Sequence, residues 1–155
     1  MRLYLMRHGK AGLNPVDEQR PLAERGIADV QMVAQHLADT GVSVSRVYHS
    51  TLVRAQQTAE LMGRALNPVH APEQRLGIEP WGDVKAFAAL ANSWTEDTLV
   101  CGHEPFMGQA ALAFQGDDPI YIQVKTATVM AFERTDAGWS LAWVVNPGRL
   151  KGESS

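Results

Sequence analysis

The sequence has few of the features that mark membrane, secreted and nucleic-acid-binding proteins. Its one cysteine, Cys101, cannot form a disulfide within the chain. No apolar run is long enough to span a membrane, and the first residues lack the apolar core of a signal peptide. Lysine and arginine total 14 against 17 aspartates and glutamates, a net charge of −3 that offers no basic excess for nucleic acid. We therefore expect a cytoplasmic, monomeric protein that binds neither membranes nor nucleic acid.

Signatures of nucleotide, thiol-phosphatase and zinc chemistry are missing as well. No Gly-rich Walker loop or dinucleotide fingerprint occurs in the sequence. A cysteine phosphatase needs an arginine six residues after its cysteine, and Met107 stands there, so we expect Cys101 in a buried strand. The spacing of His49, Cys101 and His103 is not that of zinc ligands. We expect no metal and no organic cofactor.

What the sequence does contain is an alternation of short apolar runs and amphipathic stretches. Apolar residues recur at three- and four-residue steps through residues 22–38 and 51–66, which predicts two helices, the second capped by Ser50. Further helices are expected at residues 84–91 and at 106–114, the latter with Pro105 in its first turn. Strands are expected at residues 3–6, 45–49, 69–71, 98–101, 127–132 and 141–145.

Strand and helix in repeated alternation predict one fold class. Such an order is typical of a three-layer α/β/α sandwich with a mainly parallel central sheet. The last two strands, joined by a turn at residues 136–138, are expected to add an antiparallel edge. We expect a single domain over residues 1–150 and a disordered tail at residues 151–155.

Three of the expected strands are followed by side chains that suit an anion. Arg7 and His8 follow the first strand. Arg54 lies near the start of the helix after the second strand, and His103 stands between the strand at 98–101 and the next helix. The carboxyl ends of parallel strands meet at one edge of a sheet, where helix N-termini also attract anions. We expect two arginines and two histidines to form one phosphate site at this edge.

The motifs at these strand ends resemble those of the histidine phosphatase (phosphoglycerate mutase-like) superfamily. They are Arg7-His8-Gly9, then Ser50 with Arg54 and Thr58, then Gly102-His103. The opening Arg-His-Gly-Lys-Ala and the segment Arg20-Pro21-Leu22 are most similar to the small SixA-type branch, the phosphohistidine phosphatases. The resemblance implies a metal-independent enzyme that hydrolyses phosphohistidine on a phosphorelay or phosphotransfer protein.

The resemblance also implies a role for the four strand-end residues. His8 is expected to attack phosphorus as a neutral imidazole and to carry a phosphohistidine intermediate. Arg7 and Arg54 are expected to clamp the equatorial phosphoryl oxygens with forked donors. His103 is expected to donate to the same oxygens and, if protonated, to add positive charge. Water would then release phosphate from phospho-His8.

Other positions follow the family pattern less closely. We expect Gly9, Ser50 and Asn14 to contact the substrate, Asn14 because mutase-like relatives place a phosphate-contacting asparagine there. Those relatives also carry an acid that protonates an alkoxide leaving group; Glu79 stands one position away from it, and Asp83 is the other candidate. This departure leaves two alternatives open. One is a small-molecule phosphomonoesterase, and the other is a phosphate- or phosphoprotein-binding module with weak catalysis.

Overall fold

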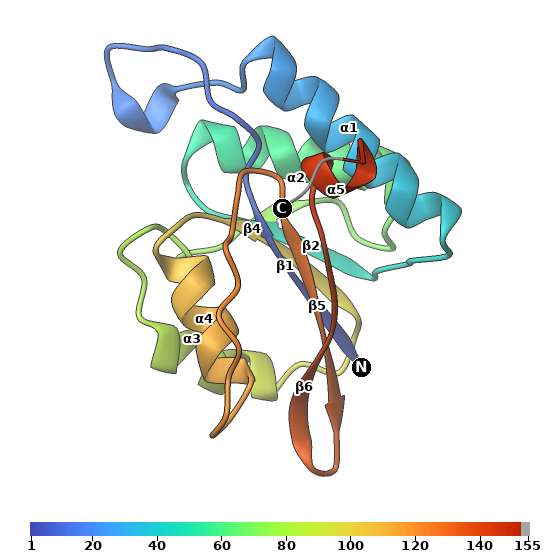
Figure 1. The fold of residues 1–155 in the computed structure, drawn as a ribbon. Coiled ribbons are helices and arrows are strands. Elements are labelled where there is room, and N and C mark those ends of the chain that lie inside the picture. The colour runs from blue at the N-terminus through green and yellow to red at the C-terminus, as the bar shows by residue number, and fades with distance from the viewer. Residues whose placement is uncertain (153–155) are drawn as a thin grey trace.

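A mixed sheet separates two layers of helices in the computed structural model, which describes residues 1–152 (Figure 1). The strands among these residues are β1 (Arg2–Arg7), β2 (Arg46–His49), β3 (Glu73–Gln74), β4 (Thr98–Gly102), β5 (Val129–Thr135) and β6 (Gly138–Val145). The helices are η1 (Asp17–Gln19), α1 (Glu24–Asp39), α2 (Val53–Leu66), α3 (Val84–Asn92), α4 (Phe106–Phe114) and α5 (Pro147–Leu150). The predicted three-layer α/β/α sandwich is confirmed.

Strand order and register bring three strand ends to the same level. The order is β3-β2-β4-β1-β5-β6, with β4 parallel to both β1 and β2. Arg7 pairs with Gly102 and His49 with Cys101, so β1, β4 and β2 end side by side. Strand β5 pairs antiparallel with β1 and β6 with β5, which forms the antiparallel edge. Residues that follow β1, β2 and β4 are therefore neighbours in space.

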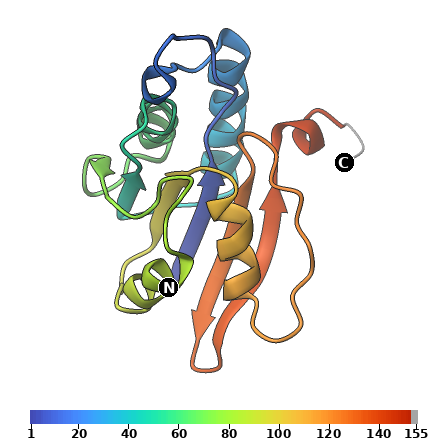
Figure 2. The same cartoon turned by 90° about the vertical axis from the view of Figure 1, so that its left-hand side faces the viewer.

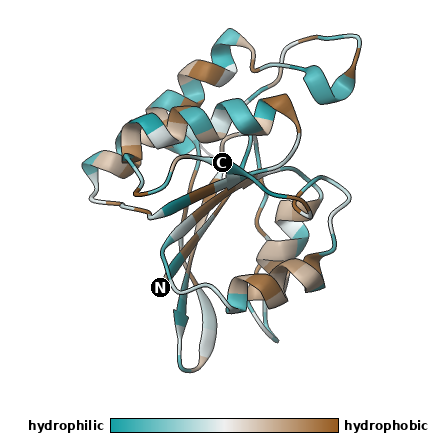
Figure 3. Cartoon of the chain, turned by 180° about the vertical axis from the view of Figure 1, so that it is seen from behind, coloured by the Kyte–Doolittle hydropathy of each residue, from teal (hydrophilic) through white to brown (hydrophobic). Residues whose placement is uncertain are grey.

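Each face of the sheet has its own hydrophobic core. The alternation of side chains along β1 sends Leu3 and Leu5 to one face and Tyr4 and Met6 to the other. Helices α1, α2 and α5 cover the Tyr4 face, and α3 and α4 cover the Leu3 face (Figures 1 and 2). The strands between the layers include strongly hydrophobic segments, whereas the helices carry mixed colours (Figure 3). Burial on both faces holds β1 rigid up to its carboxyl end.

Two local predictions about this fold are wrong. Residues 69–71 do not form a strand. Strand β3 comes later, at Glu73–Gln74, after Pro72, which has no backbone N–H to donate to a neighbouring strand. Ser50 does not cap α2, because the N-cap is Leu52, without a side-chain cap bond. The Ser50 hydroxyl instead accepts from Leu52 N at 3.2 Å and contacts a second residue described below.

Two other differences concern helix ends. Pro105 occupies the N-cap of α4 rather than a position inside its first turn. The four-residue helix α5 carries too few residues for a periodicity and was not predicted. Its end meets the predicted tail, where Lys151 Nζ lies 2.9 Å from Asp29 Oδ1. Residues 153–155 lie outside the described part of the chain. None of the helices in residues 1–152 is both long and apolar enough to cross a membrane.

Candidate active site

A cavity of about 380 Å³ lies where β1 and β4 end, and we call it the strand-end cavity. Its lining residues are Arg7, His8, Lys10, Ala11, Arg20, Arg54, Pro80, His103, Glu104 and Thr126. The four predicted strand-end residues are all among them, and the His8 and His103 ring centroids are 5.0 Å apart. A larger cavity, of about 570 Å³, lies between α1, β6 and α5. The candidate site is therefore identified by the arginine and histidine side chains in its lining and not by the size of its cavity.

The backbone around His8 selects one tautomer of its imidazole. Nδ1 lies 2.7 Å from the Gly9 carbonyl oxygen, which can only accept, so Nδ1 carries the hydrogen. Burial, reinforced by the charges of Arg54 and Arg7, lowers the pKa of His8 to about 4. At neutral pH the ring is uncharged and its lone pair is on Nε2. His8 thus has the electronic state that a nucleophilic imidazole requires.

Gly9 brings the His8 turn close to α1. A Cβ at Gly9 would lie 2.7 Å from Val30 Cγ2, so a side chain would not fit. The Gly9 N–H donates to Thr58 Oγ1 at 3.1 Å, and Thr58 in turn donates to the Arg54 carbonyl. This N–H is therefore occupied in the structure, although Gly9 was predicted to contact substrate. Thr58 was assigned no role from the sequence, but its position four residues after Arg54 indicates the same helix face.

Arg54 is held by η1, a segment that the sequence did not predict. Its NH1 donates to the Asp17 carbonyl at 2.9 Å, and NH2 lies 3.3 Å from Asp17 Oδ2. The guanidinium is nearly buried, and its charge keeps the pKa of Asp17 below the ordinary value. Arg7 is anchored differently: NH1 donates to the Val124 carbonyl, and its buried Nε has no hydrogen-bond partner among the described residues. The two guanidinium groups therefore reach the cavity from different elements, Arg7 from β1 and Arg54 from α2.

His103 is backed by Ser50. Its Nε2 lies 2.5 Å from the Ser50 hydroxyl, and its buried Nδ1 has no partner within residues 1–152. Burial, together with the nearby His8 ring, lowers the pKa of His103 to about 3, so the ring is neutral in the free protein. Nδ1 can donate to a ligand only if Ser50 donates its own hydrogen to Nε2. Ser50, fully buried, lies behind the imidazole rather than on the cavity wall.

Three further candidates lie away from the lining. Glu79 is buried, and its Oε2 accepts from Gly77 N at 2.9 Å within its own loop. Asp83 caps α3 through bonds from its first backbone N–H groups. Asn14 is exposed, and its Oδ1 accepts from Val16 N at 2.9 Å. Each polar side chain satisfies a local backbone donor, a use that residue spacing alone does not distinguish from ligand binding.

Other charged residues complete the cavity. Arg20 is held by Gly12 O at 3.0 Å, and the motif Arg20-Pro21-Leu22 was its signal in the sequence. Glu104 lines the cavity while its Oε1 accepts from Gly108 N in the first turn of α4. Four cations, including Lys10, against one carboxylate give the lining a net charge of +3. Such a wall favours an anion with several oxygen acceptors.

Two alternative chemistries find little support in the geometry. Cys101 is fully buried in β4, and burial raises the pKa of its thiol, which disfavours the reactive thiolate. Among residues 1–152, no three or more His, Cys, Asp and Glu side chains are grouped so as to hold a metal ion. The polar side chains around His8 are suited to bind an oxyanion directly.

Comparisons with known proteins agree with this geometry. A family model described as the histidine phosphatase superfamily (branch 1) matches residues 3–86. The phosphohistidine phosphatase SixA of Escherichia coli is 30% identical over 157 residues, 97% of each chain, and an uncharacterized protein of Picosynechococcus is 32% identical over 139 residues, 84% of this chain and 83% of the other. The solved structure of a protein histidine phosphatase SixA with tungstate superposes with a TM-score of 0.87 at 29% identity, covering 97% of this chain and 99% of the other.

Proposed function

Because the chain belongs to branch 1 of the histidine phosphatase superfamily, we propose that it hydrolyses phosphohistidine on a protein through a phospho-His8 intermediate. The observation that carries this proposal is the neutral His8 imidazole, with Nδ1–H bonded to Gly9 O, beside Arg7 and Arg54 in a cationic cavity. A tetrahedral oxyanion bound in that cavity would meet a nucleophile and two guanidinium groups in one place. The tungstate-bound SixA relative has the same fold.

The proposed reaction has two transfers. In the first, His8 Nε2 forms a bond to phosphorus while the P–N bond of the substrate breaks, and the leaving imidazole takes a proton from water. In the second, water attacks phospho-His8 and the new P–N bond breaks, releasing phosphate and the free imidazole. Arg7, Arg54 and His103 Nδ1 would hold the oxygens throughout, where each preorganised donor contributes about 3–4 kcal/mol to lowering the barrier.

The leaving group favours phosphohistidine over an alkyl ester. An imidazole leaves far more readily than an alkoxide, so the first transfer needs less help from an acid. Glu79 and Asp83, the predicted acids, are absent from the lining of the strand-end cavity. A small-molecule phosphomonoesterase that uses either residue stays an alternative, but the geometry gives it less support, because the carboxylate in the cavity lining is that of Glu104.

A quench experiment tests the proposed intermediate. Wild-type protein stopped by rapid quenching during turnover of phosphoimidazole should carry one acid-labile, alkali-stable phosphate, located on His8 by peptide mapping. His8→Ala should carry none and should not turn over, whereas the exposed His70→Ala should match wild type. Turnover should persist in EDTA. Phosphate on another residue, or activity lost to EDTA and restored by a divalent metal, would contradict the proposal.

We also propose the cytoplasm as the location and a monomer as the working state. A single buried cysteine is compatible with a reducing compartment. The substrate would be a phosphotransfer or phosphorelay protein that presents its phosphohistidine to the strand-end cavity. Size-exclusion chromatography with light scattering tests the monomer directly.

A further inference from the structure

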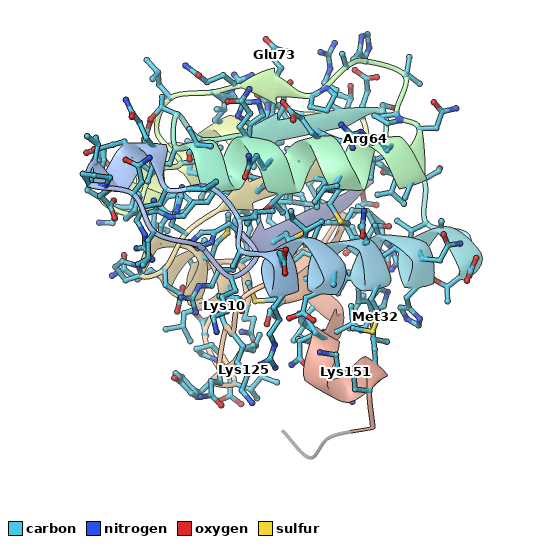
Figure 4. All side chains as sticks on the ribbon, turned by 90° about the horizontal axis from the view of Figure 1, so that it is seen from above. Lys10, Met32, Arg64, Glu73, Lys125 and Lys151 are labelled. Atoms are coloured by element: carbon cyan, nitrogen blue, oxygen red, sulfur yellow. The ribbon has the colours of Figure 1, made fainter. Side chains whose placement is uncertain are left out.

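A second cavity adjoins the strand-end cavity, and Thr126 lines both. This side cavity, of about 240 Å³, lies between α1, the segment before β5, and α5. Its lining residues are Arg25, Asp29, Lys125, Thr126, Asn146, Pro147, Gly148 and Lys151. Viewed from above in Figure 4, Lys125 and Lys151 lie on the same side of the molecule as Lys10, and Arg64 lies on the opposite side. The side cavity thus lies next to the candidate active site and is separate from it.

The side cavity is positively charged, and one buried carboxylate organises it. Asp29 lies 2.9 Å from Lys151 Nζ and 3.8 Å from Arg25 Nε, which holds both cations at the wall. Lys125 is exposed and adds a third cation. Seven cations and two carboxylates line the two cavities together, a net of +5, although the whole chain carries −3. Positive charge is concentrated around the site in an otherwise acidic protein.

The strand-end cavity has enough cations for the phosphoryl group itself. The side cavity is too small for a folded element but large enough for one or two side chains, and carboxylates fit its charge. We infer that the side cavity binds acidic side chains that flank the phosphohistidine on the partner protein. This inference rests on the proposed function and adds a specificity to it. Cationic walls also raise the encounter rate with an acidic partner, by about 10-fold to 1,000-fold at low salt.

Two synthetic phosphohistidine peptides test the inference, one flanked by glutamates and the other by lysines. Wild-type kcat/KM should favour the glutamate peptide by about tenfold at low ionic strength. The preference should largely disappear at about 1 M salt, where the Debye length is about 3 Å. Phosphoimidazole, which has no flanking residues, reports the chemistry alone.

A variant that reverses the charge of Lys125 tests the role of the side cavity. Lys125→Glu should abolish most of the preference and leave phosphoimidazole turnover unchanged, because the side chain is exposed and outside the strand-end cavity. Arg64→Glu on the exposed face of α2 makes the same charge change far from the cavities and should keep the preference. Equal kcat/KM for the two peptides in wild type would overturn the inference, as would an equal loss of preference in Arg64→Glu.

Peptide affinities for His8→Ala, which binds without turnover, separate the two proposals. Tighter binding of the glutamate peptide supports the side cavity as a docking site. If that preference is found while wild type turns over neither peptide nor phosphoimidazole, the proposed function fails and the docking site stands. If wild type turns over both peptides and the affinities are equal, the docking site fails and the function stands.

Discussion

Arg54 and Asp17, 37 residues apart in sequence, are joined by two contacts: NH1 donates to the Asp17 carbonyl, and NH2 lies 3.3 Å from its carboxylate. The carbonyl orients the guanidinium, while the carboxylate also offsets its charge. A bound phosphoryl group would compete with that carboxylate for the same fork. Asp17 therefore affects both the position of Arg54 and its strength as an anion ligand.

Asp17→Asn should separate these two effects. The variant keeps the backbone acceptor and loses the negative charge, so we expect orthophosphate to inhibit at lower concentration while kcat changes little. Inhibition constants measured at constant ionic strength test this. Glu18→Gln removes the same charge one residue away and should have a smaller effect. Weaker phosphate inhibition in Asp17→Asn would contradict this account of the pair.

Ser50→Ala should weaken catalysis through His103. Without the hydroxyl, buried Nε2 loses the donor that leaves the ring hydrogen on Nδ1. If donation from Nδ1 to the phosphoryl group weakens by about 1.4 kcal/mol in the transition state, kcat/KM falls about tenfold. In combination with His103→Asn the loss should be less than additive, because both variants disrupt one hydrogen-bonded pair. Ser93→Ala, at the exposed end of α3, is the matched control and should retain wild-type kcat/KM. Additive losses would show that Ser50 does not act through His103.

The acidic limb of the activity profile should report the lowered pKa of His8. Protonation removes the Nε2 lone pair, so kcat/KM should hold as pH falls from 7 and then decline through about 4, not through the ordinary imidazole value near 6.5. The His8 Cε1–H resonance, assigned by its absence in His8→Asn, should titrate over the same range. Rates need correction for the uncatalysed hydrolysis of phosphoimidazole. A midpoint near 6.5 for this resonance would show that burial does not control the ring.

Gly26→Ala should destabilise the fold beneath the site. A Cβ there would lie 2.1 Å from the Lys10 carbonyl oxygen, which must move together with the His8 turn. Overpacking costs about 1–3 kcal/mol, and better helix propensity offsets about 1 kcal/mol, so we expect a net loss of about 2 kcal/mol at this severe contact. Urea unfolding at pH 7 measures it. Gly12→Ala, whose Cβ would have its nearest contact at 3.5 Å, should change stability by less than about 0.5 kcal/mol.

Glu79→Gln tests the alternative activity. The amide oxygen can still accept from Gly77 N, so the loop should keep its structure. Phosphoimidazole turnover should be nearly unchanged, while any hydrolysis of an alkyl ester such as phosphoserine should fall strongly if Glu79 is its acid. Asp83→Asn, which retains an acceptor for the cap of α3, is the companion variant. Equal losses on both substrates would disprove the leaving-group argument.

The helices and central strands could be predicted closely because their signals are local. The helix expected at residues 22–38 is found at Glu24–Asp39, and the strand expected at 98–101 at Thr98–Gly102. The errors occurred where a contact with a distant part of the chain overrode the local preference. Val69 favours a strand, yet the two-residue β3 begins only after Pro72, at the point where the chain can pair with β2. A serine before a helix favours a cap, yet Ser50 is used by His103.

The sequence by itself determined which residues follow the strands, and hence that Arg7, His8, Arg54 and His103 would meet at one edge of a parallel sheet. Hydrophobic periodicity and the direction of parallel strands are enough for that conclusion. Only the tertiary structure decided what holds those side chains: Asp17 on Arg54, Thr58 on Gly9, and Ser50 on His103. It also decided that Lys151 returns to Asp29, 122 residues away, beside the site. Such contacts depend on how the helices and loops pack together, and no local pattern in the chain encodes that packing.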